Sequence, residues 1–352
     1  MRIGLIGLGR IGAFHAETLS ALPAVTSLVV TDAVPALTRA VAERLGAEPA
    51  GSAEALLAGD VDAVVIAAAT DAHPALLIAA IEAGLPVFCE KPVARTMTEG
   101  LEVVERVDQL SATVQIGYPR RFDAGFQAAR RAVASGELGW LHTIRSTTLD
   151  PAPPPEPYLA VSGGIFRDCA VHDFDAIRWV TGREVVEVWA TGSARGNPMF
   201  ARVGDVATAA TVLTLDDGSL ALVSNARFNP RGHDVRLELH GSRDSIGVGW
   251  NEQLPLRSVD AGISFPAQTP YTFFMDRFHD AFRAELTAFT DLVSGGHPSP
   301  CTVAEALEAG WIAEAATRSL HEHRPVGVAE VRPPTARPAS TLTAATSERS
   351  VS

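Results

Sequence analysis

Cysteine is scarce in this sequence, as are positive charge and long apolar runs. Only three cysteines occur in 352 residues, Cys89, Cys169 and Cys301, and no two of them form a CxxC pair. A sparse and odd set of cysteines favours a reducing cytoplasm over a disulfide-stabilised secreted scaffold. None of the three is a strong candidate for a catalytic nucleophile.

Basic residues are outnumbered by acidic ones. The chain has 29 Lys and Arg against 41 Asp and Glu, a formal net charge of -12 at pH 7. Nucleic-acid binding needs clustered basic side chains that contact phosphates, so this balance opposes a nucleic-acid partner. The only basic clusters are the pairs Arg120-Arg121 and Arg130-Arg131, which we expect to lie on solvated faces.

No uninterrupted apolar segment approaches the roughly 20 residues that cross a bilayer. The first residues, MRIGLIGLGRIGAF, are apolar, but Arg10 interrupts them and the glycine spacing differs from that of a signal peptide. We therefore expect a cytoplasmic protein with no membrane partner.

The length of the chain predicts two domains, because single cores usually stop growing near roughly 250–300 residues. Residues 1–118 alternate strand-like and helix-like segments. The expected strands are residues 2–6, 27–31, 61–68, 86–89 and 113–117. Continuous apolar strands that alternate with helices predict an α/β domain with a doubly wound parallel sheet.

The rhythm changes in residues 119–331, where most segments between 184 and 250 are strand-like. Their short connections imply antiparallel pairing, and Asp217-Gly218 is typical of a hairpin turn. Two helices are expected at about 276–294 and 302–320, which gives a second domain of α+β type. Residues 332–352 are rich in Pro, Thr, Ala and Ser, and predict a disordered tail.

A glycine motif follows the first expected strand and opens a helix: Gly7-Leu8-Gly9-Arg10-Ile11-Gly12. In this GxGxxG pattern the first glycine permits a tight turn, the second lets the backbone approach a pyrophosphate, and the third lets helix and strand pack closely. The N–H groups at the start of the helix would bind the phosphates. The context predicts a dinucleotide site.

Asp32 lies twenty residues after Gly12, at the end of the second expected strand. A carboxylate there can accept hydrogen bonds from ribose hydroxyls and repels a 2′-phosphate, so NAD is preferred over NADP. Ala33 and Val34 follow and offer no Arg for that phosphate. Asp32 could also cap a helix at Val34, a role compatible with the first.

Two further segments carry groups suited to proton chemistry. Lys91, in Glu90-Lys91-Pro92, follows a short strand, although an exposed Lys is more often plain surface. On a helix, Asp168 and His172 are i,i+4 neighbours, and Asp175 lies one turn further on. A carboxylate can orient an imidazole as a general base, although the residues alone favour a capped or core histidine at position 172. A metal site is disfavoured, since no Cys or second nearby His completes a ligand set.

The glycine motif, the EKP tripeptide at 90–92 and the pattern GGxxxDxxxHDxD at 163–175 together resemble the Gfo/Idh/MocA oxidoreductases. Their order and separation match across nearly the whole chain, and the residues 282–289 are similar to the family's C-terminal helix. Residues 115–123 and 162–179 most resemble the inositol 2-dehydrogenases of that family.

The resemblance implies an N-terminal Rossmann domain and a C-terminal α+β domain with a large open, mainly antiparallel sheet. Members commonly assemble into tetramers through that sheet, so we expect a homotetramer or a dimer. It also implies roles for individual residues. Lys91 would contact nicotinamide ribose and substrate, with Asp168 and His172 as the catalytic pair. Further cofactor contacts are implied for Arg10, Ile11, Thr70, His73 and Glu90, and further substrate contacts for Arg121 and Asp175.

The resulting hypothesis is an NAD-dependent dehydrogenase that acts on a secondary hydroxyl of a cyclic polyol, with myo-inositol to 2-keto-myo-inositol favoured. His172 would accept the hydroxyl proton, Lys91 would stabilise the charge on the oxygen, and Asp168 would align His172. Tyr118 and Pro119 depart from the family's pattern, which leaves the substrate's placement open. The alternatives are another cyclitol or a pyranose sugar as substrate, an NAD-dependent glycosidase, and a silent NAD-binding regulator.

Overall fold

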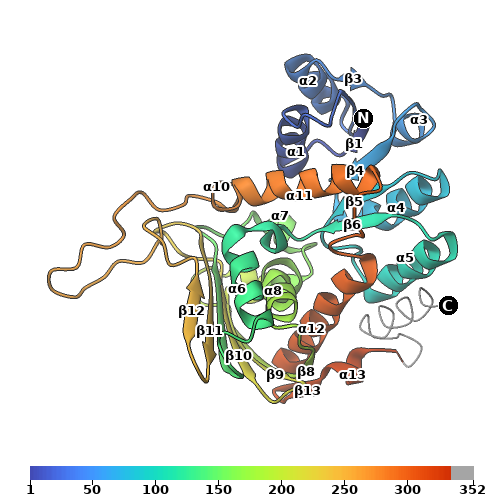
Figure 1. The fold of residues 1–352 in the computed structure, drawn as a ribbon. Helices are drawn as coiled ribbons and strands as arrows, with labels where there is room; N and C mark the ends of the chain where they lie inside the picture. The colour runs from blue at the N-terminus through green and yellow to red at the C-terminus, as the bar shows by residue number, and fades with distance from the viewer. Residues whose placement is uncertain (334–352) are drawn as a thin grey trace. The chain divides into compact units, whose positions relative to one another are not determined.

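The structure is a computed structural model and describes residues 1–333 (Figure 1). From residue 334 on, the predicted disordered tail lies outside the described residues. The chain forms two compact units: Met1–Pro119 with Asp280–Glu308, and Arg120–His279 with the described residues from Ala309 on. Among residues 1–333, no helix combines the length and the apolar character that a membrane span requires.

The first unit contains a six-stranded sheet in the order β3-β2-β1-β4-β5-β6, and all its strand pairs are parallel. The strands are β1 (Arg2–Ile6), β2 (Ser27–Thr31), β3 (Glu48–Pro49), β4 (Ala63–Ile66), β5 (Val87–Glu90) and β6 (Val114–Gly117). This order is that of a doubly wound dinucleotide-binding sheet, in which the strand order reverses between β1 and β4. The predicted parallel α/β architecture is confirmed.

Helices cover this sheet on both faces (Figure 1). They are α1 (Arg10–Ser20), α2 (Pro35–Leu45), α3 (Ala53–Leu57), α4 (His73–Glu82), α5 (Met97–Leu110) and α11 (His279–Val293), with the 3-10 turn η1 (Thr70–Ala72). Alternate strand residues such as Ala63 and Val65 share a core with α1, α2 and α11, to which Phe289 belongs. Because strand side chains alternate, Val64 and Ile66 face the opposite layer.

The second unit contains a seven-stranded sheet in the order β12-β11-β7-β10-β9-β8-β13. Its strands are β7 (Leu141–Leu149), β8 (Val185–Ser193), β9 (Thr208–Leu215), β10 (Leu220–Ala226), β11 (Asp234–Gly241), β12 (Ser245–Val248) and β13 (Val326–Gly327). Most neighbours are antiparallel, and the hairpin at Asp217-Gly218 joins β9 to β10 as predicted. The exception is the central pair β7 and β10, which is parallel.

The remaining helices are α6 (Ala124–Ala134), α7 (Glu156–Leu159), α8 (Val171–Thr181), α9 (Met199–Arg202), α10 (Phe274–Arg277), α12 (Val303–Glu322) and α13 (Val328–Val331), with a 3-10 turn η2 (Pro119–Phe122) and a π-helical turn η3 (Phe166–Ala170). In the second unit, α6 and α8 pack together on one face of the sheet (Figure 1). The side chains that point to this face are buried, whereas those on the other face are partly or largely exposed. Within residues 1–333, the sheet therefore has one covered and one open face.

Candidate active site

The residues predicted to bind the cofactor gather at one edge of the first sheet. Each follows the carboxyl end of a parallel strand: the glycine motif follows β1, Asp32 follows β2, Thr70 follows β4, and Lys91 follows β5. In open α/β sheets, ligands bind outside this edge at the point where the strand order reverses.

The glycine turn has the backbone geometry that its pattern requires. Gly7 has a φ of 94°, and an added Cβ there would lie 2.4 Å from the backbone nitrogen of Ala68. A Cβ on Gly12 would lie 1.9 Å from the carbonyl oxygen of Gly7, so helix and turn touch directly. Gly9 differs, because a Cβ there would meet no atom within 4 Å. Its backbone is open on the side from which a ligand would approach.

The first turn of α1 is suited to an anion. Gly9 is the N-cap of this helix, it offers no side-chain cap, and the first turn contains no acidic residue. The backbone N–H groups and the positive end of the helix dipole therefore face outward from Arg10 onward. A pyrophosphate fits this position by charge and by hydrogen-bonding capacity.

Asp32 lies beside the same turn and is held by two backbone N–H groups. One of its carboxylate oxygens accepts a hydrogen bond of 2.6 Å from the backbone N–H of Leu8, and the other accepts one of 2.7 Å from Val34. Helix α2 begins at Pro35 with Val34 as its N-cap, so Asp32 is not the cap of this helix. Each oxygen keeps acceptor capacity for ribose hydroxyls. With the glycine turn, these residues fit an adenine dinucleotide.

Lys91 is flanked by two hydrogen-bonded groups. The carboxylate of Glu90, directly before it, forms a 2.7 Å hydrogen bond with Nε2 of His15 on α1, and both residues are buried. Pro92, directly after it, offers its carbonyl to Nδ1 of His73 at 2.8 Å. The Nε2 atom of His73 lies 3.1 Å from the carbonyl oxygen of Ala68. The backbone on either side of Lys91 is thus fixed, while Lys91 itself is only half-buried.

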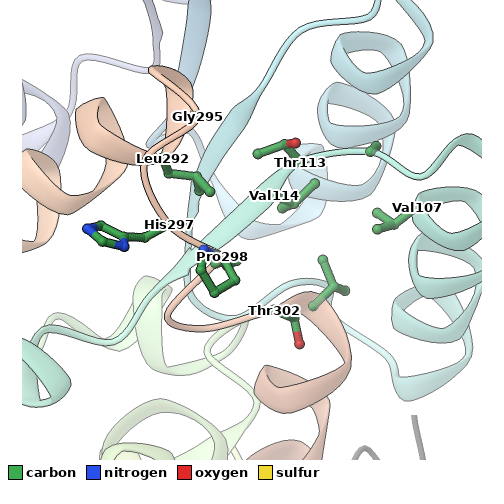
Figure 2. A pocket seen from close by; sticks show the side chains of 11 residues that line it. Val107, Thr113, Val114, Leu292, Gly295, His297, Pro298 and Thr302 are labelled. Carbon is green, nitrogen blue, oxygen red and sulfur yellow. The ribbon is translucent and has the colours of Figure 1, made fainter. Parts of the chain in front are cut away.

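The first unit also contains a cavity of about 350 Å³ near the opposite end of the sheet (Figure 2). It is lined by Val107 of α5, by Thr113 and Val114 at the start of β6, and by Leu292 and the loop after α11. Because it lies at the amino end of β6, it is separate from the carboxyl edge that carries the predicted cofactor residues.

The second unit presents Asp168 and His172 on a distorted helix. Gly163 and Gly164 have φ values of 80° and 85°, and a π-helical turn then spans Phe166–Ala170 before α8 begins. A π turn is wider than an α turn, so the expected i,i+4 stacking of Asp168 on His172 does not hold in its simple α-helical form. Both residues are half-buried. Such single π turns occur frequently at functional sites.

Asp168 is anchored by two side chains. Its Oδ2 accepts a 2.7 Å hydrogen bond from Arg227, and its Oδ1 accepts one of 2.9 Å from the hydroxyl of Tyr158. Charge-assisted bonds of this length fix a carboxylate firmly. Next to it, burial raises the pKa of the Cys169 thiol well above its ordinary value. This cysteine is therefore an uncharged packing residue, in agreement with the expectation that it is no nucleophile.

The two arginines of the pair Arg120-Arg121 each bind one aspartate of α8. Arg120 lies 2.7 Å from Asp173, and Arg121 lies 2.5 Å from Asp175. Their side chains are at most 4% exposed, so the prediction that this pair lies on a solvated face was wrong. The physical reason is charge compensation: each guanidinium can be buried because a buried carboxylate neutralises it.

Asp173 binds side chains from several elements of the second unit. It accepts hydrogen bonds from Arg120, from Ser146 and Thr148 of β7, and from Asn225 of β10, at 2.6 to 2.8 Å. These bonds tie α8 to the central strands of the sheet. The helix that carries His172 is therefore held rigidly from its buried side.

Three contacts of these candidate residues involve partners that the motifs did not indicate. His15 binds Glu90, and Tyr158 and Arg227 bind Asp168. Only His15 has a local signal, since it follows Gly12 by three residues and so lies on the face of α1 that carries the glycine. Tyr158 and Arg227 come from segments that the fold alone brings to Asp168.

Comparison with known proteins supports this assignment of parts. Residues 1–118 match the oxidoreductase family with an NAD-binding Rossmann fold, and residues 126–247 match the Gfo/Idh/MocA C-terminal domain. The chain is 36% identical over 333 residues to myo-inositol 2-dehydrogenase of Thermotoga maritima, which covers 94% of this chain and 99% of the relative. It is 33% identical to the NAD-dependent scyllo-inositol 2-dehydrogenase of Bacillus subtilis, over 93% and 96% of the two chains.

A crystal structure of scyllo-inositol dehydrogenase from Lactobacillus casei, with bound NAD(H) and scyllo-inositol, superposes with a TM-score of 0.84 at 28% identity. The match covers 94% of this chain and 99% of that structure. With both domains matched in order and relatives that align over nearly their full length, this chain belongs to the Gfo/Idh/MocA family of NAD-dependent oxidoreductases.

Proposed function

We propose that the protein is an NAD-dependent dehydrogenase of a cyclic polyol, which oxidises one secondary hydroxyl of myo-inositol to give 2-keto-myo-inositol. Two observations carry the proposal: the glycine turn with Asp32 held beside it in the first unit, and, four residues before His172 in the second unit, the Asp168 carboxylate that Arg227 and Tyr158 hold. Relatives at 33% and 36% identity are named for dehydrogenation of scyllo- and myo-inositol, which supports the substrate class.

NAD, when bound, supplies the acceptor for the hydride that leaves the carbinol carbon. The protein's own task is to bind the hydroxyl and move its proton. We assign His172 as the general base that takes this proton, because a neutral imidazole titrates in the working pH range. Lys91 donates a hydrogen bond to the same oxygen and stabilises the negative charge that develops there.

Asp168 orients His172 and stabilises its cationic form after proton transfer. The hydrogen bonds from Arg227 and Tyr158 support this role, since they hold the carboxylate as a fixed acceptor. The same bonds make Asp168 a poor proton acceptor itself, because protonation would forfeit the charge-assisted bond to the guanidinium.

The remaining predicted contacts are assigned by position. Thr70, which opens η1 after β4, would border the cofactor, and Arg10 and Ile11 would offer backbone N–H groups at the start of α1. Arg121 and Asp175 neutralise each other inside the unit. We propose that they shape the substrate pocket from behind, in addition to any direct contact with a hydroxyl.

The enzyme can be tested with purified protein, NAD and a panel of cyclitols, aldoses and aryl glycosides. We expect NADH to form in proportion to a cyclitol, with myo-inositol ahead of scyllo- and chiro-inositol. His172→Ala should lower turnover by about 10²- to 10⁴-fold, the usual contribution of a positioned base, while NAD affinity stays the same.

Two outcomes would contradict the proposal. Release of the aglycone from a glycoside without net NADH would identify the glycosidase alternative. Near-normal turnover of His172→Ala with the best substrate would remove His172 from the chemistry. Replacement of an exposed histidine, His321→Ala, is the control for nonspecific effects, because His321 lies on the exposed surface of α12.

We also propose that copies of the chain associate into a homotetramer, or a dimer, through the open face of the second sheet. Strand register aligns Trp189, Val212 and Leu222 in one row across β8, β9 and β10. Trp189 is 47% exposed and Leu222 is 42% exposed. A contiguous apolar row on a sheet face that none of the described helices covers is typical of an oligomer interface.

The oligomer is tested by the mass in solution of Trp189→Arg and Leu222→Glu. Both variants should dissociate into smaller species, because each buries a charge if the face is covered. Leu37→Arg, at an equally exposed apolar position on α2, should leave the mass unchanged. An unchanged mass in all three variants would contradict this interface.

A cytoplasmic location is proposed as well. All three cysteines are free and buried, which suits a reducing compartment. Fractionation of cells that produce the protein tests this.

A further inference from the structure

A parallel strand pair in the second unit places two charged residues side by side. Strands β7 and β10 run in parallel, with Leu149 opposite Ala226 in the register. The next residue of each strand is Asp150 and Arg227, so both leave the sheet at the same edge. The backbone N–H of Asp150 donates to the carbonyl of Ala226 at 2.8 Å, which fixes this alignment.

Arg227 uses this position to bridge two carboxylates. Its Nη1 donates to Asp150 at 2.9 Å and its Nη2 donates to Asp168 at 2.7 Å. The Arg227 side chain is only 4% exposed, against 22% for Asp150 and 12% for Asp168. The guanidinium is thus the buried centre of a three-residue cluster, and its member Asp168 precedes the proposed base, His172, by four residues in the chain.

Two titratable groups beside this cluster, His233 and Cys169, carry no charge at neutral pH, and the charged groups nearby are paired: Arg120 with Asp173 and Arg277 with Asp123. Burial, with Arg120 and Arg277 nearby, lowers the pKa of His233 to about 3, so this ring beside Asp150 is neutral. Burial also raises the pKa of the Cys169 thiol. For Arg227, burial disfavours the charge, but the neighbouring acidic groups outweigh it and raise the pKa above its ordinary value.

The cluster therefore has two negative charges and one positive charge. We propose that Arg227 is a positioning residue for the oxidation, and that with Asp150 it sets both the direction of the Asp168 carboxylate and the net charge that His172 experiences. This inference rests on the proposed roles of Asp168 and His172. Neither Arg227 nor Asp150 has to touch the substrate.

The proposal predicts an order of pH profiles, because substitutions change the net charge of the cluster in steps. In the wild type, the cluster of Arg227, Asp150 and Asp168 has one net negative charge. The cluster has two in Arg227→Gln and none in Asp150→Asn. The double variant Arg227→Gln/Asp150→Asn returns to one. More negative charge favours the protonated imidazole, so His172 becomes a base only at higher pH.

The experiment measures kcat/KM against pH in the direction of oxidation, with NAD and the most active cyclitol of the panel. Relative to wild type, the ascending limb should move up by about one pH unit in Arg227→Gln and down by a similar amount in Asp150→Asn. In the double variant it should lie near the wild-type position. Turnover of the double variant should stay at least about tenfold low, because Asp168 has lost the donor that aims it.

Arg227→Lys provides the conservative comparison. It keeps the positive charge, and so the pH midpoint, but one ammonium cannot reproduce the two-armed bridge. Arg178→Gln is the matched structural control, since Arg178 is 6% exposed and binds Glu184 with two nitrogens at 2.7 Å, away from Asp168. It should lower stability without moving the pH midpoint.

The outcomes separate this inference from the proposed function. If His172→Ala abolishes turnover but all Arg227 and Asp150 variants share the wild-type midpoint, the positioning role is wrong and the proposed function stands. If His172→Ala is active, the proposed function fails first. Urea unfolding of each variant shows which ones are folded. If Arg227→Gln does not fold, Asp150→Asn and the double variant still test whether the pH midpoint follows the net charge of the cluster.

Discussion

His15 and Glu90 are joined by a buried 2.7 Å hydrogen bond between helix α1 and the end of strand β5. The bond connects the two motifs that the family comparison covers: His15 follows the glycine turn by three residues, and Glu90 directly precedes Lys91. Through it, the position of the proposed catalytic amine depends on α1, the helix proposed to bind the cofactor phosphates.

Removal of this contact should cost both stability and turnover. His15→Ala leaves a buried carboxylate without its imidazole partner, and we expect the free energy of unfolding to fall by about 1–3 kcal/mol. Turnover should fall as well, because Lys91 loses its fixed neighbour, and His15→Gln should restore part of both. Urea unfolding and steady-state kinetics measure the two effects. A change within about 0.5 kcal/mol, as for an ordinary surface site, would contradict this role.

The first sheet could be predicted from the sequence because its signals are local. Continuous apolar runs, helical spacing and the glycine turn each occupy a few consecutive residues, and the observed strands agree with the expected ones to within a few residues. The expected strand 61–68, for example, is β4 at Ala63–Ile66. Short elements with weak patterns, such as β3 and α3, were not predicted.

The contacts that complete the candidate site could not be predicted, since they join residues far apart in sequence. Arg120 and Asp173 are separated by 53 residues, and Arg227 and Asp168 by 59. An arginine pair without its partners is typical of a solvated surface. Only the fold shows that α8 supplies an aspartate to each arginine. The parallel pairing of β7 with β10 is equally nonlocal, because short connections indicate only antiparallel neighbours.

Cofactor preference should change when the charge of Asp32 is removed. Asp32→Asn keeps an acceptor oxygen for the backbone N–H of Leu8 but loses the negative charge that repels a 2′-phosphate. We expect kcat/KM with NADP to rise by about tenfold or more relative to that with NAD. Repulsion between the Asp32 carboxylate and an adjacent 2′-phosphate has about this effect, and the variant removes it. Initial rates with both cofactors measure the ratio. Asp32→Ala, which also removes the acceptor oxygen, should weaken binding of both cofactors. If Asp32→Asn leaves the ratio of the two kcat/KM values unchanged, Asp32 does not determine the cofactor preference.

Acid should destabilise the protein through His233. Its pKa is lowered from 6.5 to about 3 in the folded state by burial and by Arg120 and Arg277, so the unfolded chain binds the extra proton between these values. Stability therefore falls as pH decreases through this window, and His233 alone contributes a slope of about 1.4 kcal/mol per pH unit. In the same buffer and salt, the free energy of unfolding of His233→Gln should fall less steeply from pH 6 to pH 4 than that of the wild type. Parallel curves for wild type and variant would show that His233 does not govern acid sensitivity.

Lys91 is the only lysine in the 352-residue chain, which makes its amine uniquely addressable. Reductive methylation with a carbon-13 label would mark only this side chain and the α-amine of Met1, which donates to the carbonyl of Ala24 at 2.6 Å. NMR should then resolve two signals, and Lys91→Arg should remove one of them and identify it. The proposed hydrogen bond to the reacting oxygen predicts that the Lys91 signal moves on addition of NAD and moves again with the cyclitol.

The Met1 signal is the internal control, because this amine lies at the amino end of β1, opposite the carboxyl end that the glycine motif follows, and donates to the backbone carbonyl of Ala24. It should stay in place in every titration. A Lys91 signal that ignores both ligands at saturation, in protein that still forms NADH, would separate the amine from the chemistry and leave His172 to act with another donor. Because the readout is a chemical shift and not a rate, it distinguishes a lysine that contacts the ligands from one that only supports the fold.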